Sequence, residues 1–260
     1  MKHPDKNTVV YLLPNLFTTA NLFCGFYSVV ASLQDLYLPA AMAIFFAGVF
    51  DILDGRVARL TKLNSKFGEE YDSLADLISF GIAPAMLMYL WSIESFGRLG
   101  WLACFVYLAC GALRLARFNI KASYTHKSHF EGLPIPMAAY AVATTVLIFH
   151  ELMLEEFKNP FTLGLTVTLA FLMVSSIPYK SFKDLDLKNK KSFGILVTAV
   201  FIFMVVAYNP GVMMFVVMML YILSGPLLLP WSLKKLALQN NVQTQSKQTL
   251  KLIEKDAQNV

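Results

Sequence analysis

The sequence predicts an all-α membrane protein, a polytopic bundle of about eight transmembrane helices. Of its 260 residues, 57% are hydrophobic and only 15% are charged, whereas soluble domains carry about 25% charged residues. The mean hydropathy of +0.56 agrees with this assignment. The apolar residues also gather into long segments, which is typical of helices that cross a bilayer. Composition therefore argues against a soluble enzyme.

Eight apolar segments approach the length of about 17 to 25 residues that a bilayer-crossing helix needs. They cover residues 12–33, 37–59, 69–92, 98–118, 134–153, 160–178, 193–208 and 210–230. We expect residues 1–231 to form a single membrane-embedded domain. Residues 232–260 are rich in Gln, Asn and Lys, and we expect them to form a polar cytoplasmic tail that is partly disordered.

Positive charge alternates with these segments and therefore indicates orientation. In an eight-span arrangement, 20 of the 22 Lys and Arg residues fall on one side, and only Arg98 and Lys158 fall on the other. Basic residues concentrate on the cytoplasmic side, so we expect an integral protein of the cell (inner) membrane with both termini in the cytoplasm. The net charge of +5 then reflects topology and anionic lipid headgroups. No basic stripe with interleaved aromatic residues supports a nucleic-acid partner.

Four aspartates between residues 51 and 76 stand out in a chain with few acids. An acid at membrane depth is costly unless it faces protein, water or a metal ion. Asp51 and Asp54 are three apart, and Asp72 and Asp76 are four apart, so each pair projects from one helical face. Two such helices side by side would form a cage of carboxylates. Four carboxylates suit two divalent metal ions, Mg2+ or Mn2+, better than one.

Small residues continue the helical face that carries Asp51. Gly55 and Ala58 leave room for a flat ligand against the helix backbone. Arg59, one turn after Gly55, offers a forked hydrogen-bond donor to phosphate. The alternative is that the acids only pack between helices and pair with Arg56 or Arg59.

The pattern D-x-x-D-G-x-x-A-R-x8-G-x3-D-x3-D, from Asp51 to Asp76, resembles the signature of the CDP-alcohol phosphatidyltransferase family at every fixed position. The resemblance extends over roughly residues 10–230. It implies a six-helix membrane core, two metal ions, and a reaction in which an alcohol displaces CMP from a CDP-linked lipid. It also implies that all four aspartates bind metal, with Asp76 as general base as well. The residues implied to contact the CDP-lipid are Gly55, Ala58, Arg59, Ser65 and Gly68.

Polar residues near the start of the first span add to this expectation. In the family, the corresponding region lines the nucleotide pocket, so Asn15, Thr18 and Asn21 are expected to bind cytidine or ribose. Helix capping by Asn15 is the alternative.

Two later stretches, residues 114–119 and 130–139, resemble the branch of the family that uses L-serine as acceptor. Arg114 and Arg117 lie three apart and could bind a carboxylate or phosphate by forked hydrogen bonds, or could simply anchor a membrane edge. The resemblance thus implies CDP-diacylglycerol and L-serine as substrates, phosphatidylserine and CMP as products, and suggests a homodimer. Glycerol 3-phosphate, inositol or choline are alternative acceptors. A transporter or cation channel with intramembrane aspartates is the alternative outside the family.

Overall fold

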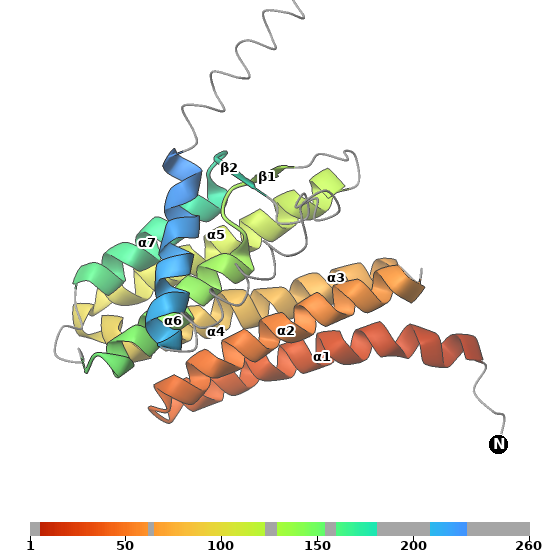
Figure 1. Ribbon diagram of the computed structural model, residues 1–260, viewed down its shortest axis with the longest axis horizontal. Helices are drawn as coiled ribbons and strands as arrows, with labels where there is room; N and C mark the ends of the chain where they lie inside the picture. The colour runs from red at the N-terminus through yellow and green to blue at the C-terminus, as the bar shows by residue number, and fades with distance from the viewer. Residues whose placement is uncertain (1–5, 62–64, 123–128, 154–159, 181–208, 228–260) are drawn as a thin grey trace, which may run out of the picture.

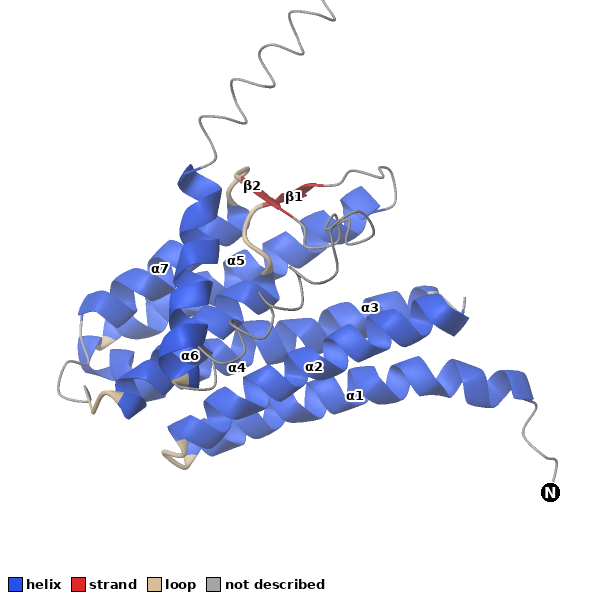
Figure 2. Ribbon diagram, viewed as in Figure 1, coloured by secondary structure: helices blue, strands red, loops and turns tan. Residues whose placement is uncertain are grey.

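A computed structural model describes residues 6–61, 65–122, 129–153, 160–180 and 209–227 of the chain. These residues are almost entirely helical (Figures 1 and 2). Five helical stretches are long and apolar enough to cross a membrane, namely Asn15–Leu33, Tyr37–Leu60, Lys66–Phe96, Arg98–Ile120 and Pro210–Leu227. Two shorter apolar helices match the fifth and sixth expected spans. The prediction of an all-α membrane bundle is confirmed, while the span expected at 193–208 and the tail lie outside the described residues.

The first two helices, α1 (Lys6–Leu33) and α2 (Tyr37–Thr61), form a hairpin and lie side by side in Figure 1. The connection is tight, because the Leu36 N–H donates to the Ala31 carbonyl at 2.9 Å. Ser28 on α1 donates from Oγ to the carbonyl of the fully buried Ala40 on α2, also at 2.9 Å. This hairpin places the early part of α1 beside the end of α2, where the first two aspartates lie.

The third span is one helical run whose hydrogen bonding changes along its length. It consists of α3 (Lys66–Asp76), the π-helical η1 (Leu77–Ile82), α4 (Ala83–Met88), the π-helical η2 (Tyr89–Ile93) and the 3-10 turn η3 (Glu94–Phe96). Ser65 caps α3, since its Oγ accepts the Gly68 N–H at 3.0 Å. The run changes from α to π directly after Asp76, and π-helical turns within longer helices are frequent at functional sites.

A close approach fixes α1 against η1. A Cβ atom on Gly25 would collide with the Ser79 side chain, so only glycine allows the two backbones to come this near. The Ser79 hydroxyl in turn donates to the Asn21 carbonyl at 2.9 Å. The contact sets the height of α1 relative to the second pair of aspartates.

Helix α5 (Arg98–Ala122) packs against the third span and against α7 (Pro160–Val174), while α6 (Ile135–Glu151) packs mainly on α2. The final helix is Pro210–Leu227. Two short strands, β1 (His129–Glu131) and β2 (Pro178–Lys180), pair antiparallel with Phe130 opposite Tyr179.

Tyr179 connects this ribbon to the final helix. Its hydroxyl donates to the Ile222 carbonyl at 3.1 Å, and its ring occupies the space left by Gly225. Burial raises the pKa of Tyr179 to about 12, so the hydroxyl remains a donor at neutral pH. The ribbon and the final helix are thereby held together at one end of the bundle.

Candidate active site

The four aspartates converge where the end of α2 meets α3. One carboxylate oxygen from each of Asp51, Asp72 and Asp76 lies within 4.8 Å of the others. Asp54 is only 5% exposed and lies within hydrogen-bonding reach of Asp72. The spacing of three on α2 and four on α3 keeps each pair on one helical face, and the packing of α1 against both helices turns these faces toward each other.

Helix α1 supplies neutral hydrogen-bond donors to two of the acids. The Thr18 hydroxyl donates to Asp54 Oδ2 at 3.0 Å, and Asn21 Nδ2 donates to Asp76 Oδ1 at 3.1 Å. Thr18 is 3% exposed and Asn21 is fully buried. The sequence led us to expect these two side chains at the nucleotide, and the structure adds contacts to the carboxylates. Their contact with cytidine or ribose stays a prediction.

The cluster fits a divalent cation by its donor set and by its unmet hydrogen-bonding capacity. All of its ligand atoms are carboxylate oxygens, the atoms that Mg2+ and Mn2+ prefer. Within the part of the chain that the structure describes, Asp72 Oδ1 is buried and has no hydrogen-bond partner. Carboxylates this close also repel one another unless a positive charge lies between them. Asp51, Asp54, Asp72 and Asp76 are therefore the residues that would hold the metal ions.

The basic residues of α2 bear on the alternative in which the acids serve only for helix packing and pair with Arg56 or Arg59. Arg59 is exposed and donates from Nε to the Gly55 carbonyl of its own helix at 2.7 Å. Arg56 is exposed as well. A Cβ built on Gly55 would meet no atom within 4 Å, so the helix backbone is open there. The binding of a flat ligand along Gly55 and Ala58 stays a prediction.

The start of α3 lies across from the start of the first span. A Cβ on Gly68 would come 3.1 Å from Ser65 Oγ and 3.6 Å from Asn15 Oδ1. Ser65 and Gly68 thus have a capping role at α3, and Asn15 lies beside them on α1. Helix capping explains Ser65 without a ligand, and its contact with the CDP-lipid stays a prediction.

The family model for CDP-alcohol phosphatidyltransferase matches residues 11–182. The chain belongs to this family. It is 38% identical over 217 residues to the CDP-diacylglycerol–serine O-phosphatidyltransferase of Helicobacter pylori (strain J99), with 83% of this chain and 90% of the relative covered. It is 34% identical to the Bacillus subtilis protein of the same name, with 69% and 96% covered. It is 35% identical to the archaetidylserine synthase of Methanothermobacter thermautotrophicus, with 69% and 74% covered.

Within this phosphatidyltransferase, the two arginines on α5 have different surroundings. Arg117 donates to the carbonyls of residues 173–175 at 3.0 to 3.3 Å, so it satisfies the carboxyl end of α7. Arg114 is 7% exposed and interacts electrostatically with Asp76. Its Nε has no hydrogen-bond partner among the described residues. Arg114 therefore has a donor left for a ligand. The prediction from sequence gave both arginines the same role.

Sequence reasoning missed the residues that tie α3 to its neighbours. Asn119 on α5 donates from Nδ2 to Ser73 Oγ at 2.9 Å, and Tyr71 shares a hydrogen bond of 3.0 Å with Thr19 on α1. Both contacts flank Asp72. No local spacing signals them, because the partners are 46 and 52 residues apart.

Proposed function

We propose that this membrane enzyme transfers the phosphatidyl group of CDP-diacylglycerol to the hydroxyl of L-serine, giving phosphatidylserine and CMP. The aspartate cluster supports the phosphoryl chemistry, because Asp51, Asp72 and Asp76 bring carboxylate oxygens within 4.8 Å of one another, and the cations of a diphosphate need such ligands. The acceptor is supported by the relatives, three of which carry serine in their names. The proposal rests on the presence of this aspartate cluster in a chain of the CDP-alcohol phosphatidyltransferase family.

The residues around the cluster have separate tasks in this proposal. Two divalent cations held by the aspartates would supply charge neutralisation for the diphosphate and the departing CMP. Asn21 binds one oxygen of Asp76, which leaves the second oxygen to accept the proton of the serine hydroxyl. The serine oxygen bonds to the phosphorus that carries the diacylglycerol, the bond from this phosphorus to the oxygen of CMP breaks, and CMP leaves as an anion.

The donor lipid and the acceptor approach the acids from different helices. Gly55, Ala58 and Arg59 on α2 offer an open backbone and an exposed guanidinium to the CDP group. Arg114 on α5 offers a buried positive charge near Asp76, and we assign it to the carboxylate of serine. The corresponding role of Arg117 stays a prediction, since its known contacts are with α7.

We further propose that the cluster opens to the cytoplasm, that residues 1–231 form one domain with a cytoplasmic tail, and that the enzyme is a homodimer. The first statement rests on the distribution of Lys and Arg, and the last rests on the family resemblance alone. Labelling of single cysteines introduced at each terminus, in sealed vesicles of known orientation, tests the sidedness.

The test of the function is an acceptor panel. Purified enzyme is incubated with CDP-diacylglycerol and Mg2+ plus one alcohol at a time: L-serine, glycerol 3-phosphate, inositol or choline. We expect release of CMP and formation of a new lipid with serine alone, and no release from the Asp72→Asn variant. Equal release with another alcohol would reassign the acceptor. If CMP is released with none of the alcohols, the proposed reaction is wrong.

A further inference from the structure

Tyr140 on α6 places its hydroxyl against the backbone of α2. A Cβ atom built on the buried Gly48 would collide with this hydroxyl, so the phenol oxygen occupies the space that a side chain at residue 48 would fill. Gly48 lies three residues before Asp51 on the same helix. Cβ atoms at this spacing are about 5–6 Å apart. The hydroxyl therefore lies about one turn of α2 away from a cluster aspartate.

Aromatic contacts fix the direction of the Tyr140 ring. It stacks on Phe45 of α2 with ring centroids 5.3 Å apart and an angle of 6° between the planes. It also meets the fully buried Phe80 edge-on, at 6.3 Å and 74°. Phe80 follows Asp76 by four residues in the third span. The phenol is thus held by neighbours that lie about one turn from an aspartate of each pair.

The hydroxyl is close enough to the acids to interact with them but not to bond to them directly. Tyr140 interacts electrostatically with Asp51 and Asp76. Among the residues that the structure describes, neither acid is bonded to the Tyr140 hydroxyl. A buried tyrosine hydroxyl usually has a hydrogen-bond partner, and polar groups more than about 3.5 Å apart are often joined by a water molecule.

Asp51 differs from two of its neighbours in the cluster. Thr18 donates to Asp54 and Asn21 donates to Asp76. No side chain in the described ranges donates to Asp51, which interacts with other acids instead. A carboxylate that binds a cation needs a hydrogen-bond donor to orient it. Tyr140 is the phenol placed to serve Asp51.

We propose that Tyr140 is a positioning residue for Asp51. Its hydroxyl donates to a water molecule, and this water donates to the carboxylate of Asp51, which is thereby held in the orientation that binds a cation. The inference deepens the proposed function, because it rests on the assignment of the cations to the aspartates. If an oxygen of serine took the place of the water, Tyr140 would instead contact the substrate, and the test separates these two roles.

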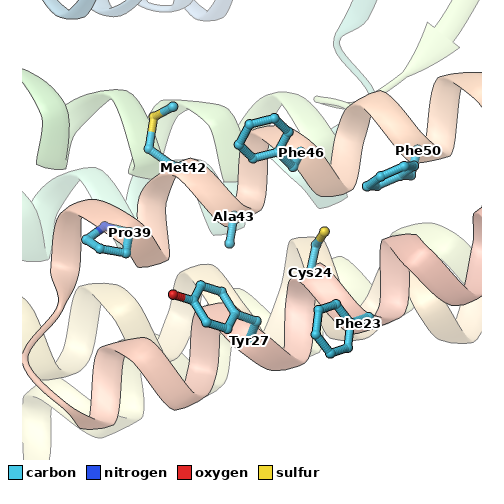
Figure 3. Close-up of a pocket in the computed structure, with 8 residues that line it drawn as sticks. All are labelled: Phe23, Cys24, Tyr27, Pro39, Met42, Ala43, Phe46 and Phe50. Carbon is cyan, nitrogen blue, oxygen red and sulfur yellow. The ribbon is translucent and has the colours of Figure 1, made fainter.

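The test is a titration of purified, substrate-free enzyme with Mn2+, in which electron paramagnetic resonance measures the free ion. Tyr140→Phe removes one oxygen atom and keeps the ring, and it should raise the dissociation constant for Mn2+ about tenfold, as expected when the partner of a metal ligand is lost. Tyr107→Phe is the matched control, since Tyr107 is 1% exposed and donates to the Phe80 carbonyl at 3.2 Å. Tyr27→Phe is the second control, because the apolar groove that Tyr27 lines is lined by no acid (Figure 3). Both controls should keep the wild-type dissociation constant.

Gly48→Ala removes the same hydroxyl from its place without changing Tyr140. Its methyl group would fill the space of the phenol oxygen, so we expect a similar loss of Mn2+ affinity, and no further loss when it is combined with Tyr140→Phe.

Three results would overturn the assignment of Tyr140. They are an unchanged dissociation constant in Tyr140→Phe, an equal rise in Tyr107→Phe, and a raised KM for serine in Tyr140→Phe with unchanged Mn2+ binding, which would make Tyr140 a substrate contact. A different result bears on the proposed function alone. If Tyr140→Phe loses Mn2+ affinity but the wild type releases no CMP with serine, the proposed reaction is wrong and the role of Tyr140 at Asp51 is retained.

Discussion

Replacing Thr18 by valine should weaken the binding of divalent cations without disturbing the helix bundle. The change keeps the shape of the side chain and removes the hydroxyl that donates to Asp54 Oδ2 at 3.0 Å. A hydrogen bond to a charged group contributes about 1.5–3 kcal/mol, and Thr18 is only 3% exposed, so water cannot easily replace the donor. Each 1.4 kcal/mol is about a factor of ten, and loss of a partner that orients a metal ligand typically costs about 10- to 100-fold in metal affinity.

The assay is CMP release from CDP-diacylglycerol and serine as a function of Mg2+ concentration. We expect the Mg2+ concentration for half-maximal rate to rise at least about tenfold in Thr18→Val, and Thr18→Ser to restore it. The matched control is Thr19→Val, because Thr19 is the neighbouring threonine on α1 and contacts Asn15 and Tyr71 but none of the acids. An unchanged Mg2+ requirement in Thr18→Val, or an equal shift in Thr19→Val, would refute the idea that α1 orients the cluster.

Four further outcomes follow from the same geometry. Asp51→Asn and Asp72→Asn should each nearly abolish turnover while the helical content measured by circular dichroism is retained, because the cluster loses a charge that the cations need; turnover near the wild-type rate at saturating Mg2+ would contradict this. Gly55→Leu should raise KM for CDP-diacylglycerol with little change in Mn2+ affinity, since its side chain fills the open backbone face; unchanged donor affinity would rule out the flat pocket. Arg114→Lys should raise KM for serine about tenfold or more by losing the planar fork, and an equal effect on the donor would make it a phosphate ligand. Arg117→Ala should lower the thermal midpoint through loss of the α7 carbonyl contacts, and an unaltered midpoint would show that these contacts add no stability.

The sequence was most informative where chemistry depends on local spacing. Asp51 and Asp54 are three residues apart, and Asp72 and Asp76 are four apart, so each pair lies on one face of its helix. The structure brings these two faces together. Long apolar segments predicted the spans, and seven of the eight expected ones have a helix among the described residues. The expectation that 69–92 is a single span also holds, although its backbone passes through two π-helical stretches that hydropathy cannot reveal.

The contacts between helices could not be predicted in the same way. Thr18 and Asn21 are recognisable as polar residues in an apolar span, but nothing local to them names Asp54 or Asp76 as partners. The difference between Arg114 and Arg117 likewise depends on where α7 ends in space. The close approach of Gly25 to Ser79 shows the same limit, since a glycine in a helix is compatible with many neighbours.

The most direct test of whether the aspartates bind metal is a titration of the purified enzyme with Mn2+ in the presence of CDP-diacylglycerol. Electron paramagnetic resonance measures the free ion. The account predicts two bound ions per chain in the wild type, a clear loss of binding in Asp72→Asn, and a parallel loss of serine-dependent CMP release when the ions are removed by chelation. Undiminished Mn2+ binding by Asp72→Asn, or full CMP release by chelated enzyme, would contradict it.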